Sequence, residues 1–242
     1  MPKNICVLTG AGMSADSGLK TFRDADGLWE GHDVMEVASP RGFYSNPELV
    51  LDFYNQRRRQ LLQVAPNKAH LALAALEEHF NVAIITQNVD DLHERAGSSR
   101  VVHLHGELLK VRSTGDPSFI LDWRKDLYLG DTCVKGHQLR PHIVWFGEEV
   151  PLLQKAAEIT QDSEILLIIG TSMQVYPAAG LVNYAPRDIP IYFVDPKPTV
   201  RSGDFEHLRI IPERAAIGVP ALVRGLIDKA PGFGSRNGGG SS

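Results

Sequence analysis

The stretch VLTGAGMSADSGLKTFRDADGLW, which runs from Val7 to Trp29, contains the pattern that decides the fold. An apolar run leads directly into Gly10-Ala11-Gly12, as is typical of the turn after the first strand of a dinucleotide-binding sheet. The third glycine of that pattern is absent, and Phe22 and Arg23 follow a few residues later. Because a G-x-G pair alone is a weak signal, the rest of the chain has to decide what this turn does.

Uninterrupted apolar runs predict the strands of a parallel sheet. Strands that are buried on both faces of a sheet read as continuous apolar segments and not as alternating ones. Five such runs occur in the chain: Asn4–Thr9, Val82–Thr86, Val101–His105, Ile165–Ile169 and Ile189–Val194.

Helical patterns separate these runs. Asn67 is placed as an N-cap for KAHLALAALEEHF, and Pro47 stands where a first helical turn tolerates proline, ahead of ELVLDFYNQRRRQLL. Residues Val219–Lys229 are expected to close the fold as a helix. The alternation of strand and helix predicts an α/β fold with a doubly wound parallel sheet.

Two segments interrupt the alternation, and we expect both to be insertions within one domain that spans residues 1–230. The segment from about residue 24 to residue 66 carries mostly helical patterns. The segment from about residue 107 to residue 140 is polar and irregular, with turn signals in STGDPS and LGDTCVKG, which predicts a smaller inserted module. We expect Trp123, Leu127 and Tyr128 to be the apolar anchors of that module.

The final residues 231–242, PGFGSRNGGGSS, have the composition of a flexible linker. We expect this tail to be disordered, and such a sequence is typical of tails added for expression.

Composition excludes several classes of protein. A net charge of −4 with interspersed signs gives no sign of a surface for nucleic acid or anionic membranes. The two cysteines, Cys6 and Cys133, argue against a disulfide framework and indicate a reducing compartment. Because no signal-peptide core or long apolar span is visible, we expect a cytoplasmic protein, and a monomer by default.

Polar clusters follow four of the predicted strands, where an open parallel sheet binds its ligands. The clusters are Gly10–Ser14, Thr86–Asp90, Gly170–Ser172 and Asp195. Gly10 and Gly12 would let backbone N–H groups approach a pyrophosphate, with Ser14 as an added donor. Asp195 can accept hydrogen bonds from both hydroxyls of a ribose; the alternative is a turn-forming aspartate before Pro196.

The segment VVHLHGEL places two histidines two residues apart, at the end of a predicted strand. We interpret His103 as a buried histidine with satisfied hydrogen bonds. His105, next to Gly106, is better placed to act as a general base, because its pKa near neutrality suits proton removal.

Five motifs together resemble one known family. They are GAGMSADSGLKTFR (Gly10–Arg23), TQNVD (Thr86–Asp90), HLHG (His103–Gly106), PHIVWFGE (Pro141–Glu148) and GTSMQVYPAA (Gly170–Ala179). Their order and spacing resemble the sirtuins, which are NAD-dependent protein-lysine deacylases, and especially the bacterial CobB-type enzymes that also remove acidic acyl groups. The resemblance implies a Rossmann-like domain that cleaves NAD instead of transferring hydride.

The resemblance also implies roles for individual residues. His105 would be the general base that activates a ribose hydroxyl, and Asn88 would organise the nicotinamide ribose and a water. The products would be free lysine, nicotinamide and O-acyl-ADP-ribose. The residues assigned in this way to NAD binding are Gly10, Ala11, Gly12, Ser14, Phe22, Arg23, Trp29, Gln87, Asn88, Asp90, Gly170, Thr171, Ser172, Asp195 and Ala215.

Two further groups of residues resemble the substrate-binding parts of that family. The segment Val144, Trp145, Phe146 and Gly147 is similar to the part that pairs with the substrate peptide as an added strand; the alternative for Trp145 and Phe146 is ordinary core. Tyr54 and Arg57, three residues apart on one helix face, resemble a motif that recognises acidic acyl groups. The alternative for this pair is a solvated basic face, because further arginines follow Arg57 directly.

The chain departs from the family at the structural zinc. Most sirtuins bind zinc with four cysteines, whereas the segment 107–140 contains only Cys133, with Ser113 where an earlier cysteine is expected. Because a closed zinc site needs about four nitrogen or sulfur ligands, we expect no structural zinc. His137, His142 and Asp116 are the other residues that could contribute ligands.

Three functions remain open at the level of sequence. The first is NAD-dependent deacylation of acetyl- and succinyl-type lysines on proteins or peptides. The second is mono-ADP-ribosyl transfer to protein from the same bound NAD. The third is a catalytically silent NAD-binding module.

Overall fold

The computed structural model describes residues 2–20, 28–29 and 31–230. Phe22, Arg23 and the tail 231–242 lie outside the described residues, so the expectations stated for them remain predictions.

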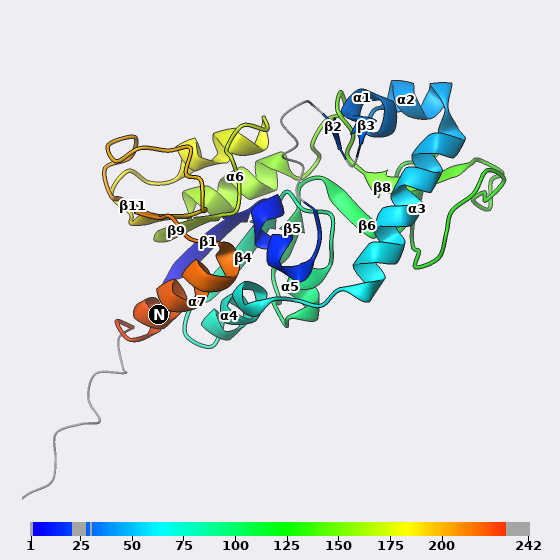
Figure 1. The fold of residues 1–242 in the computed structure, drawn as a ribbon. Coiled ribbons are helices and arrows are strands. Elements are labelled where there is room, and N and C mark those ends of the chain that lie inside the picture. The colour runs from blue at the N-terminus through cyan, green and yellow to red at the C-terminus, as the bar shows by residue number, and fades with distance from the viewer. Residues whose placement is uncertain (1, 21–27, 30, 231–242) are drawn as a thin grey trace, which may run out of the picture.

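Six parallel strands form the central sheet, in the order β11-β10-β9-β1-β4-β5 (Figure 1). The predicted α/β fold with a doubly wound parallel sheet is thereby confirmed, since the order reverses between β1 and β9. The strands are β1 (Asn4–Thr9), β4 (Asn81–Thr86), β5 (Val101–His103), β9 (Ile165–Ile169), β10 (Ile191–Val194) and β11 (Leu208–Ile211).

Helices cover both faces of this sheet, and the side chains of each strand alternate between the two cores. In β1, Ile5 and Val7 pack against α4 (Lys68–Leu76) and α7 (Ala215–Ile227). The opposite face of the sheet is covered by α6 (Leu153–Gln161) and the 3-10 helix η3 (Ala178–Tyr184), against which Cys6 and Leu8 pack. Figure 1 shows α4 and α7 below the sheet and α6 above it.

The expected N-cap of α4 is confirmed. Asn67 accepts a hydrogen bond from the backbone N–H of Ala69 at 2.9 Å, and His70 Nδ1 accepts one from the backbone N–H of Asn67 at 3.3 Å. The side-chain amide of Asn67 also donates to the carbonyl of Met13 at 2.9 Å. This cap therefore ties α4 to the first glycine turn.

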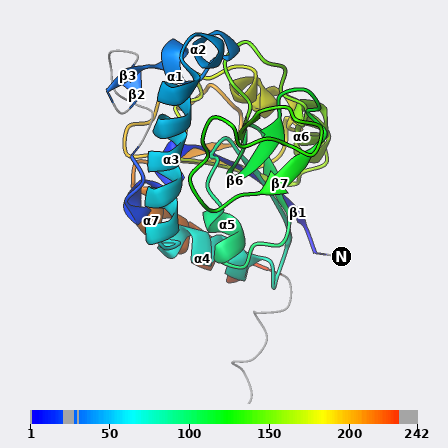
Figure 2. The ribbon, with the colours of Figure 1, turned by 90° about the vertical axis from the view of Figure 1, so that its right-hand side faces the viewer.

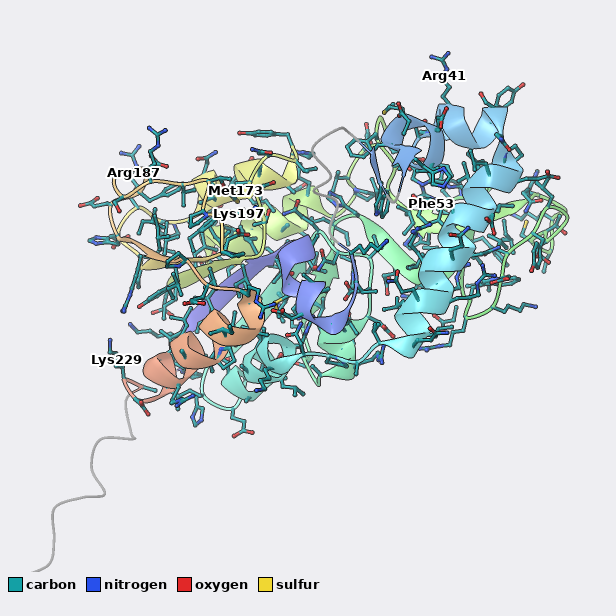
Figure 3. All side chains as sticks on the ribbon, in the orientation of Figure 1. Arg41, Phe53, Met173, Arg187, Lys197 and Lys229 are labelled. Atoms are coloured by element: carbon teal, nitrogen blue, oxygen red, sulfur yellow. The ribbon has the colours of Figure 1, made fainter. Side chains whose placement is uncertain are left out.

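A smaller module lies at one end of the molecule, where two separate stretches of chain pack together (Figures 1 and 2). Its elements are β2 (Leu28–Trp29), β3 (His32–Asp33), α1 (Val34–Val37), α2 (Pro40–Ser45), α3 (Pro47–Gln63), β6 (Gly106–Ser113), β7 (Ile120–Asp122) and β8 (Leu139–Ile143). The short helices η1 (Ala11–Met13) and η2 (Ala15–Ser17) follow β1, and Met13 packs in the core of the main sheet. The helix α5 (Leu92–Arg95) follows β4 on the main sheet. Figure 3 shows Arg41 projecting away from the module at its outer end.

The structure corrects the expectation that the segment 107–140 is irregular. Strands β6, β7 and β8 form a three-stranded sheet in which both neighbours of β6 run antiparallel to it. Leu127 is fully buried and Trp123 is half-buried, but Tyr128 is 60% exposed and so is not an anchor. Cys133 takes that place instead, packed in a buried cluster with Leu127.

The last helix begins earlier than expected, at Ala215 and not at Val219. Pro220 lies inside it, and because proline is favoured in a first turn, the sequence pattern places the start too close to this residue. None of the helices in the described part of the chain has the length and apolar character needed to cross a membrane.

Two glycine turns touch each other where the strand order reverses. Gly12 N–H donates to the carbonyl of Gly170 at 2.8 Å, and a Cβ built on Gly12 would lie 2.7 Å from the Cα of Gly170. Only glycine at both positions therefore allows the turns after β1 and β9 to lie this close.

We predict that Gly12→Ala lowers the free energy of unfolding by about 1–3 kcal/mol, because the added methyl overpacks this contact. Gly225→Ala is the matched control. A Cβ there meets nothing within 4 Å inside α7, so this variant should gain roughly 0.5–1 kcal/mol. Chemical denaturation of the two variants and the parent measures both changes. A Gly12→Ala protein as stable as the parent contradicts the steric interpretation.

Candidate active site

One cavity of about 300 Å³ lies beyond the carboxyl ends of β1, β4 and β9, at the reversal of strand order. The main sheet forms one side of it, and α3 with the segment after β8 forms the other. Most of the residues predicted to act in binding or catalysis line it: Gly10, Ala11, Ser14, Trp29, Tyr54, Arg57, Gln87, Asn88, Asp90, His105, Val144, Trp145, Phe146, Gly147, Gly170, Thr171 and Ser172. The structure thus brings the residues expected at the cofactor and those expected at the substrate into one crevice.

The glycine amides have a different use from the one expected. Gly10 N–H donates to the carbonyl of Ile169 at 3.0 Å, and Gly12 N–H donates to that of Gly170. Their hydrogen bonds therefore hold the two turns together. Gly10 still lines the cavity, whereas Gly12 lies behind it. The requirement for glycine here is steric.

Asp195 and Ala215 also lie outside the lining of the cavity. Asp195 is 1% exposed, and its Oδ1 accepts the backbone N–H of Lys197 at 2.9 Å. This is the turn-forming geometry considered for an aspartate before Pro196. Ala215 is buried at the start of α7. Contact of either residue with a bound nucleotide remains a prediction.

Asn88 is held by both hydrogens of its side-chain amide. Its Nδ2 donates to the carbonyl of Gly10 at 3.0 Å and to Ser14 Oγ at 3.1 Å, while its backbone N–H donates to Thr86 Oγ1 at 3.0 Å. Because these bonds use the donors of the amide, Asn88 meets a ligand only through Oδ1, as an acceptor. Such an acceptor suits a ribose hydroxyl or a water.

Asp90 extends this network into the protein. Its Oδ2 accepts the hydroxyl of Ser14 at 2.8 Å, and its Oδ1 accepts the backbone N–H of Leu92 at 3.1 Å. Burial raises the pKa of Asp90, although these two hydrogen bonds oppose the shift. The carboxyl group therefore fixes Ser14 and, through it, the amide of Asn88.

His105 has the geometry of a neutral base. Its Nδ1 lies 3.0 Å from the carbonyl oxygen of Gln87, which can only accept, so Nδ1 carries the proton and Nε2 carries the lone pair. Burial lowers the pKa of His105 below its usual value of 6.5, despite the opposing effect of the bond to Gln87. The imidazole is therefore neutral at physiological pH and can take up a proton at Nε2.

His103 has the opposite character, in agreement with its interpretation as a satisfied, buried histidine. Its Nε2 lies 2.6 Å from Glu94 Oε1, and its Nδ1 lies 3.3 Å from the carbonyl of Asn88. Burial alone would lower the pKa of His103, but the hydrogen bond and charge of Glu94 raise it overall. The acceptor at each nitrogen favours the cationic form of this ring, which holds the carbonyl of Asn88.

Tyr54 and Arg57 belong to α3 and line the side of the cavity opposite the main sheet. The alternative of a solvated basic face does not describe this pair, because Tyr54 is 1% exposed and both residues line the cavity. The next residue, Arg58, is also 1% exposed and donates to the carbonyl of Leu108 at 3.2 Å. The guanidinium of Arg57 lies 3.9 Å from the ring centroid of Phe53, which Figure 3 labels on α3. Arg57 Nη1 also donates to the Phe53 carbonyl at 2.8 Å.

The segment after β8 is anchored from both sides. Val144 N–H donates to the carbonyl of His105 at 2.9 Å, and Phe146 N–H donates to that of Ala38 at 2.9 Å. Trp145 is 2% exposed and packs in the core of the module, whereas Phe146 is 41% exposed. The core alternative therefore holds for Trp145 but not for Phe146.

Sequence reasoning missed several lining residues: Leu19, Lys20, Ala38, Gln60, Leu61, Val89, Leu108, Ile143, Glu148, Val150, Val175, Tyr176 and Pro177. Gln60 follows Arg57 by three residues, so helical periodicity could have found it. Val175 to Pro177 lie within the GTSMQVYPAA motif. Glu148 is the last residue of PHIVWFGE. Its contacts with Arg140 and the backbone of Trp145 become visible only in the folded structure.

The residues considered as zinc ligands do not gather. Cys133 Sγ accepts a hydrogen bond from Ser113 Oγ at 3.3 Å, and Asp116 pairs with Lys135 at 2.9 Å. Within residues 2–20, 28–29 and 31–230, no group of three or more histidine, cysteine or acidic residues is placed to hold a metal ion.

Comparison with known proteins agrees with this geometry. A model of the Sir2 family matches residues 10–177. An NAD-dependent protein deacylase of Helicobacter pylori strain 26695 is 66% identical over 195 residues, covering 81% of this chain and 85% of that protein. One of strain J99 is 60% identical over 228 residues, covering 94% and 97%.

Solved structures give the same result. A Sir2 homologue in complex with NAD has a TM-score of 0.84 at 37% identity, covering 94% of this chain and 90% of that one. Sir2 bound to an acetylated peptide has a TM-score of 0.74 at 29% identity, covering 94% and 93%.

We predict that the two neighbouring histidines titrate on opposite sides of pH 6.5. His105 should titrate below this value and carry its proton on Nδ1 when neutral, while His103 should titrate above it. Long-range ¹H–¹⁵N NMR correlations across a pH series report both the pKa and the tautomer, with His105→Gln and His103→Gln to assign the signals. A His105 ring that is protonated on Nε2 at pH 7.5 contradicts the proposed base.

Proposed function

The chain belongs to the Sir2 family, and from this premise we propose that its cavity binds NAD and an acyl-lysine side chain together. The protein is an NAD-dependent protein deacylase: the acyl group leaves lysine for ADP-ribose, and nicotinamide is released. The acyl groups that we assign to it are acetyl and acidic groups such as succinyl.

The observation that carries this proposal is the position of His105 and Asn88 on one crevice with the two glycine turns. The lone pair of His105 Nε2 and the acceptor Oδ1 of Asn88 both belong to this rim. Around them the rim offers hydroxyl and amide groups from Ser14, Gln87 and Thr171. This set of donors and acceptors fits a nucleotide sugar.

Each residue then has a defined task. Bound NAD supplies the bond between ribose and nicotinamide, whose cleavage drives the transfer. Asn88 Oδ1 accepts a hydrogen bond from a ribose hydroxyl or a water, and so fixes the sugar. His105 Nε2 removes the proton from a ribose hydroxyl, so that its oxygen can bond to the acyl carbon. The burial that lowers the pKa of His105 keeps the base unprotonated until that step.

The acidic acyl preference rests on Tyr54 and Arg57. Both side chains line the cavity, three residues apart on one face of α3. A guanidinium can hold a carboxylate through two parallel hydrogen bonds, and a phenol can add a third. Acetyl groups fit the same channel without using these contacts.

The substrate peptide is assigned to the segment from Val144 to Gly147, next to the exposed ring of Phe146. Pairing through backbone atoms tolerates many sequences, so we propose a broad range of protein substrates. We propose that the enzyme is monomeric and cytoplasmic, and a net charge of −4 gives no sign of a nucleic-acid partner.

Protein ADP-ribosyl transfer and a silent module are the alternatives. No contact among the described residues that line the cavity favours either of them, and the two Helicobacter pylori relatives carry the name of deacylases. Release of nicotinamide that requires both NAD and an acylated peptide, with loss of the acyl group, tests the assignment. Labelled ADP-ribose left on protein without acyl loss would instead indicate the transferase.

Replacement of His105 by alanine is expected to lower kcat for deacylation by about 10²–10⁴-fold, the usual contribution of a general base. The parent enzyme should lose kcat/KM as the pH falls through the pKa of His105, with a midpoint below 6.5. Steady-state assays across pH measure both effects, and binding of ADP-ribose to His105→Ala controls for folding. Full turnover by this variant excludes the mechanism.

Arg57→Met should lower the activity on succinyl-lysine far more than the activity on acetyl-lysine. Loss of a charge-assisted contact worth about 1.5–3 kcal/mol predicts a drop of roughly 10–150-fold in kcat/KM for a succinyl-lysine peptide. The acetyl-lysine version of that peptide should change by less than about threefold, because its methyl group makes no such contact. Arg59→Met is the matched control, since Arg59 pairs with Asp126 on the surface. Equal losses on both peptides contradict the role of Arg57.

A further inference from the structure

A buried hydrogen bond joins the two substrate-binding parts of the cavity. Trp145 Nε1 donates to Tyr54 Oη at 2.9 Å, across 91 residues of sequence. Both side chains are at most 2% exposed, and both line the cavity. The bond therefore connects the segment that follows β8 to helix α3 in the wall of the cavity.

This bond decides how Tyr54 can interact with a ligand. A phenol has one proton to donate and an oxygen that accepts. The indole N–H of Trp145 occupies the accepting side, and no acceptor within the described residues takes the proton of Tyr54. Burial raises the pKa of Tyr54, so the hydroxyl keeps this proton. Within the cavity, the group is a donor.

Trp145 cannot easily turn away from this position. The guanidinium of Arg140 lies 3.4 Å from the centroid of its ring, and Phe43 packs against it with ring centroids 5.3 Å apart. Its backbone N–H donates to Glu148 Oε2 at 2.8 Å. Stacking on one face and a hydrogen bond on the backbone fix the direction in which the indole N–H points.

A partly buried ion cluster holds Glu148 and Arg140 in turn. Arg140 binds Glu148 through two parallel bonds of 2.7 and 2.9 Å, and Arg112 Nη2 reaches the same carboxylate at 2.9 Å. Burial favours the neutral form of Glu148, but the bonds from Arg140 and Trp145 lower its pKa overall. The cluster contains two cations and one anion, and it holds both the backbone and the ring of Trp145.

We propose that Trp145, positioned by Arg140 and Glu148, makes Tyr54 a donor-only group that selects acyl chains ending in a hydrogen-bond acceptor. This inference rests on the proposed deacylase function and deepens it. Arg57 also carries only donors, so these two lining side chains present N–H and O–H groups to a ligand. A terminal carboxylate accepts from both.

The proposal separates two acyl chains of the same size. A succinyl group ends in two acceptor oxygens, whereas the succinamyl group replaces one oxygen with a donating NH₂. In a donor-only pocket that NH₂ meets another donor, which leaves both without a partner. If Tyr54 could also accept, it would accommodate the amide. The ratio of kcat/KM for succinyl-lysine to succinamyl-lysine therefore reports the donor-only state.

Trp145→Phe tests the proposal, because it removes the indole N–H and keeps an aromatic ring for Arg140. The parent should favour the succinyl over the succinamyl peptide by about tenfold or more, and Trp145→Phe should reduce that ratio by about fivefold, the effect of one hydrogen bond. Trp123→Phe is the matched control: it loses an indole bond to Asp126 in the same module but outside the cavity, and should leave the ratio unchanged.

Tyr54→Phe supplies a second arm. Tyr54→Phe should lower the ratio of kcat/KM for the succinyl and succinamyl peptides to the value measured for Trp145→Phe. The double variant should show no further loss, because both changes remove the same hydrogen bond. The tryptophan N–H signals in ¹H–¹⁵N NMR spectra give a readout independent of turnover. Tyr54→Phe should shift the Trp145 indole proton upfield and leave that of Trp123 in place.

The outcomes separate this inference from the proposed function. If the parent enzyme removes neither succinyl nor acetyl groups, the proposed function fails. The donor-only inference is overturned if the parent prefers the succinyl peptide and Trp145→Phe leaves the ratio of kcat/KM for the succinyl and succinamyl peptides unchanged. It is also overturned if Tyr54→Phe does not shift the Trp145 indole N–H signal.

Discussion

The contact between the turns after β1 and β9 is the constraint on which the rest of the site depends. Gly12 lies against Gly170 at a distance that no side chain allows, and the amides of these turns are used to hold the contact. The carbonyl of Gly10 is left facing Asn88, which it fixes by accepting from Nδ2. A steric requirement in the backbone therefore places the amide that meets the sugar, and the polar rim forms around it.

Burial and hydrogen-bond partners then give the two histidines of one short motif different protonation behaviour and different roles. His103 sits between Glu94 and a backbone carbonyl, which favours the cation and makes the ring a brace for the Asn88 main chain. His105 has one carbonyl acceptor at Nδ1 and no carboxylate partner among the described residues, so burial dominates and the ring stays neutral. The same physical terms, in different proportions, yield a positioning group and a base.

The sheet could be predicted from sequence because its central strands are continuous apolar runs, as in Ile165–Ile169. The edge strand β11 escaped notice because Arg209 interrupts a short run. The sheet of the small module was not predicted because β6 and β8 are separated by a long, polar segment. The pairing of these two strands also contains a register shift. Local spacing also placed Tyr54 and Arg57 on one face of a helix. It could not reveal the bond of Tyr54 to Trp145, since that bond depends on the packing of segments distant in sequence.

Titration of the protein with ADP-ribose, followed by NMR, tests the central claim most directly, because this molecule carries the sugar but no reacting bond. If the cavity at the strand reversal binds the sugar, saturable shifts should appear at His105, Asn88 and Ser172, and the tryptophan signal of Trp123 should not move. Saturable binding that leaves His105 and Asn88 unchanged would contradict the account, because the base and the amide would then face a different site.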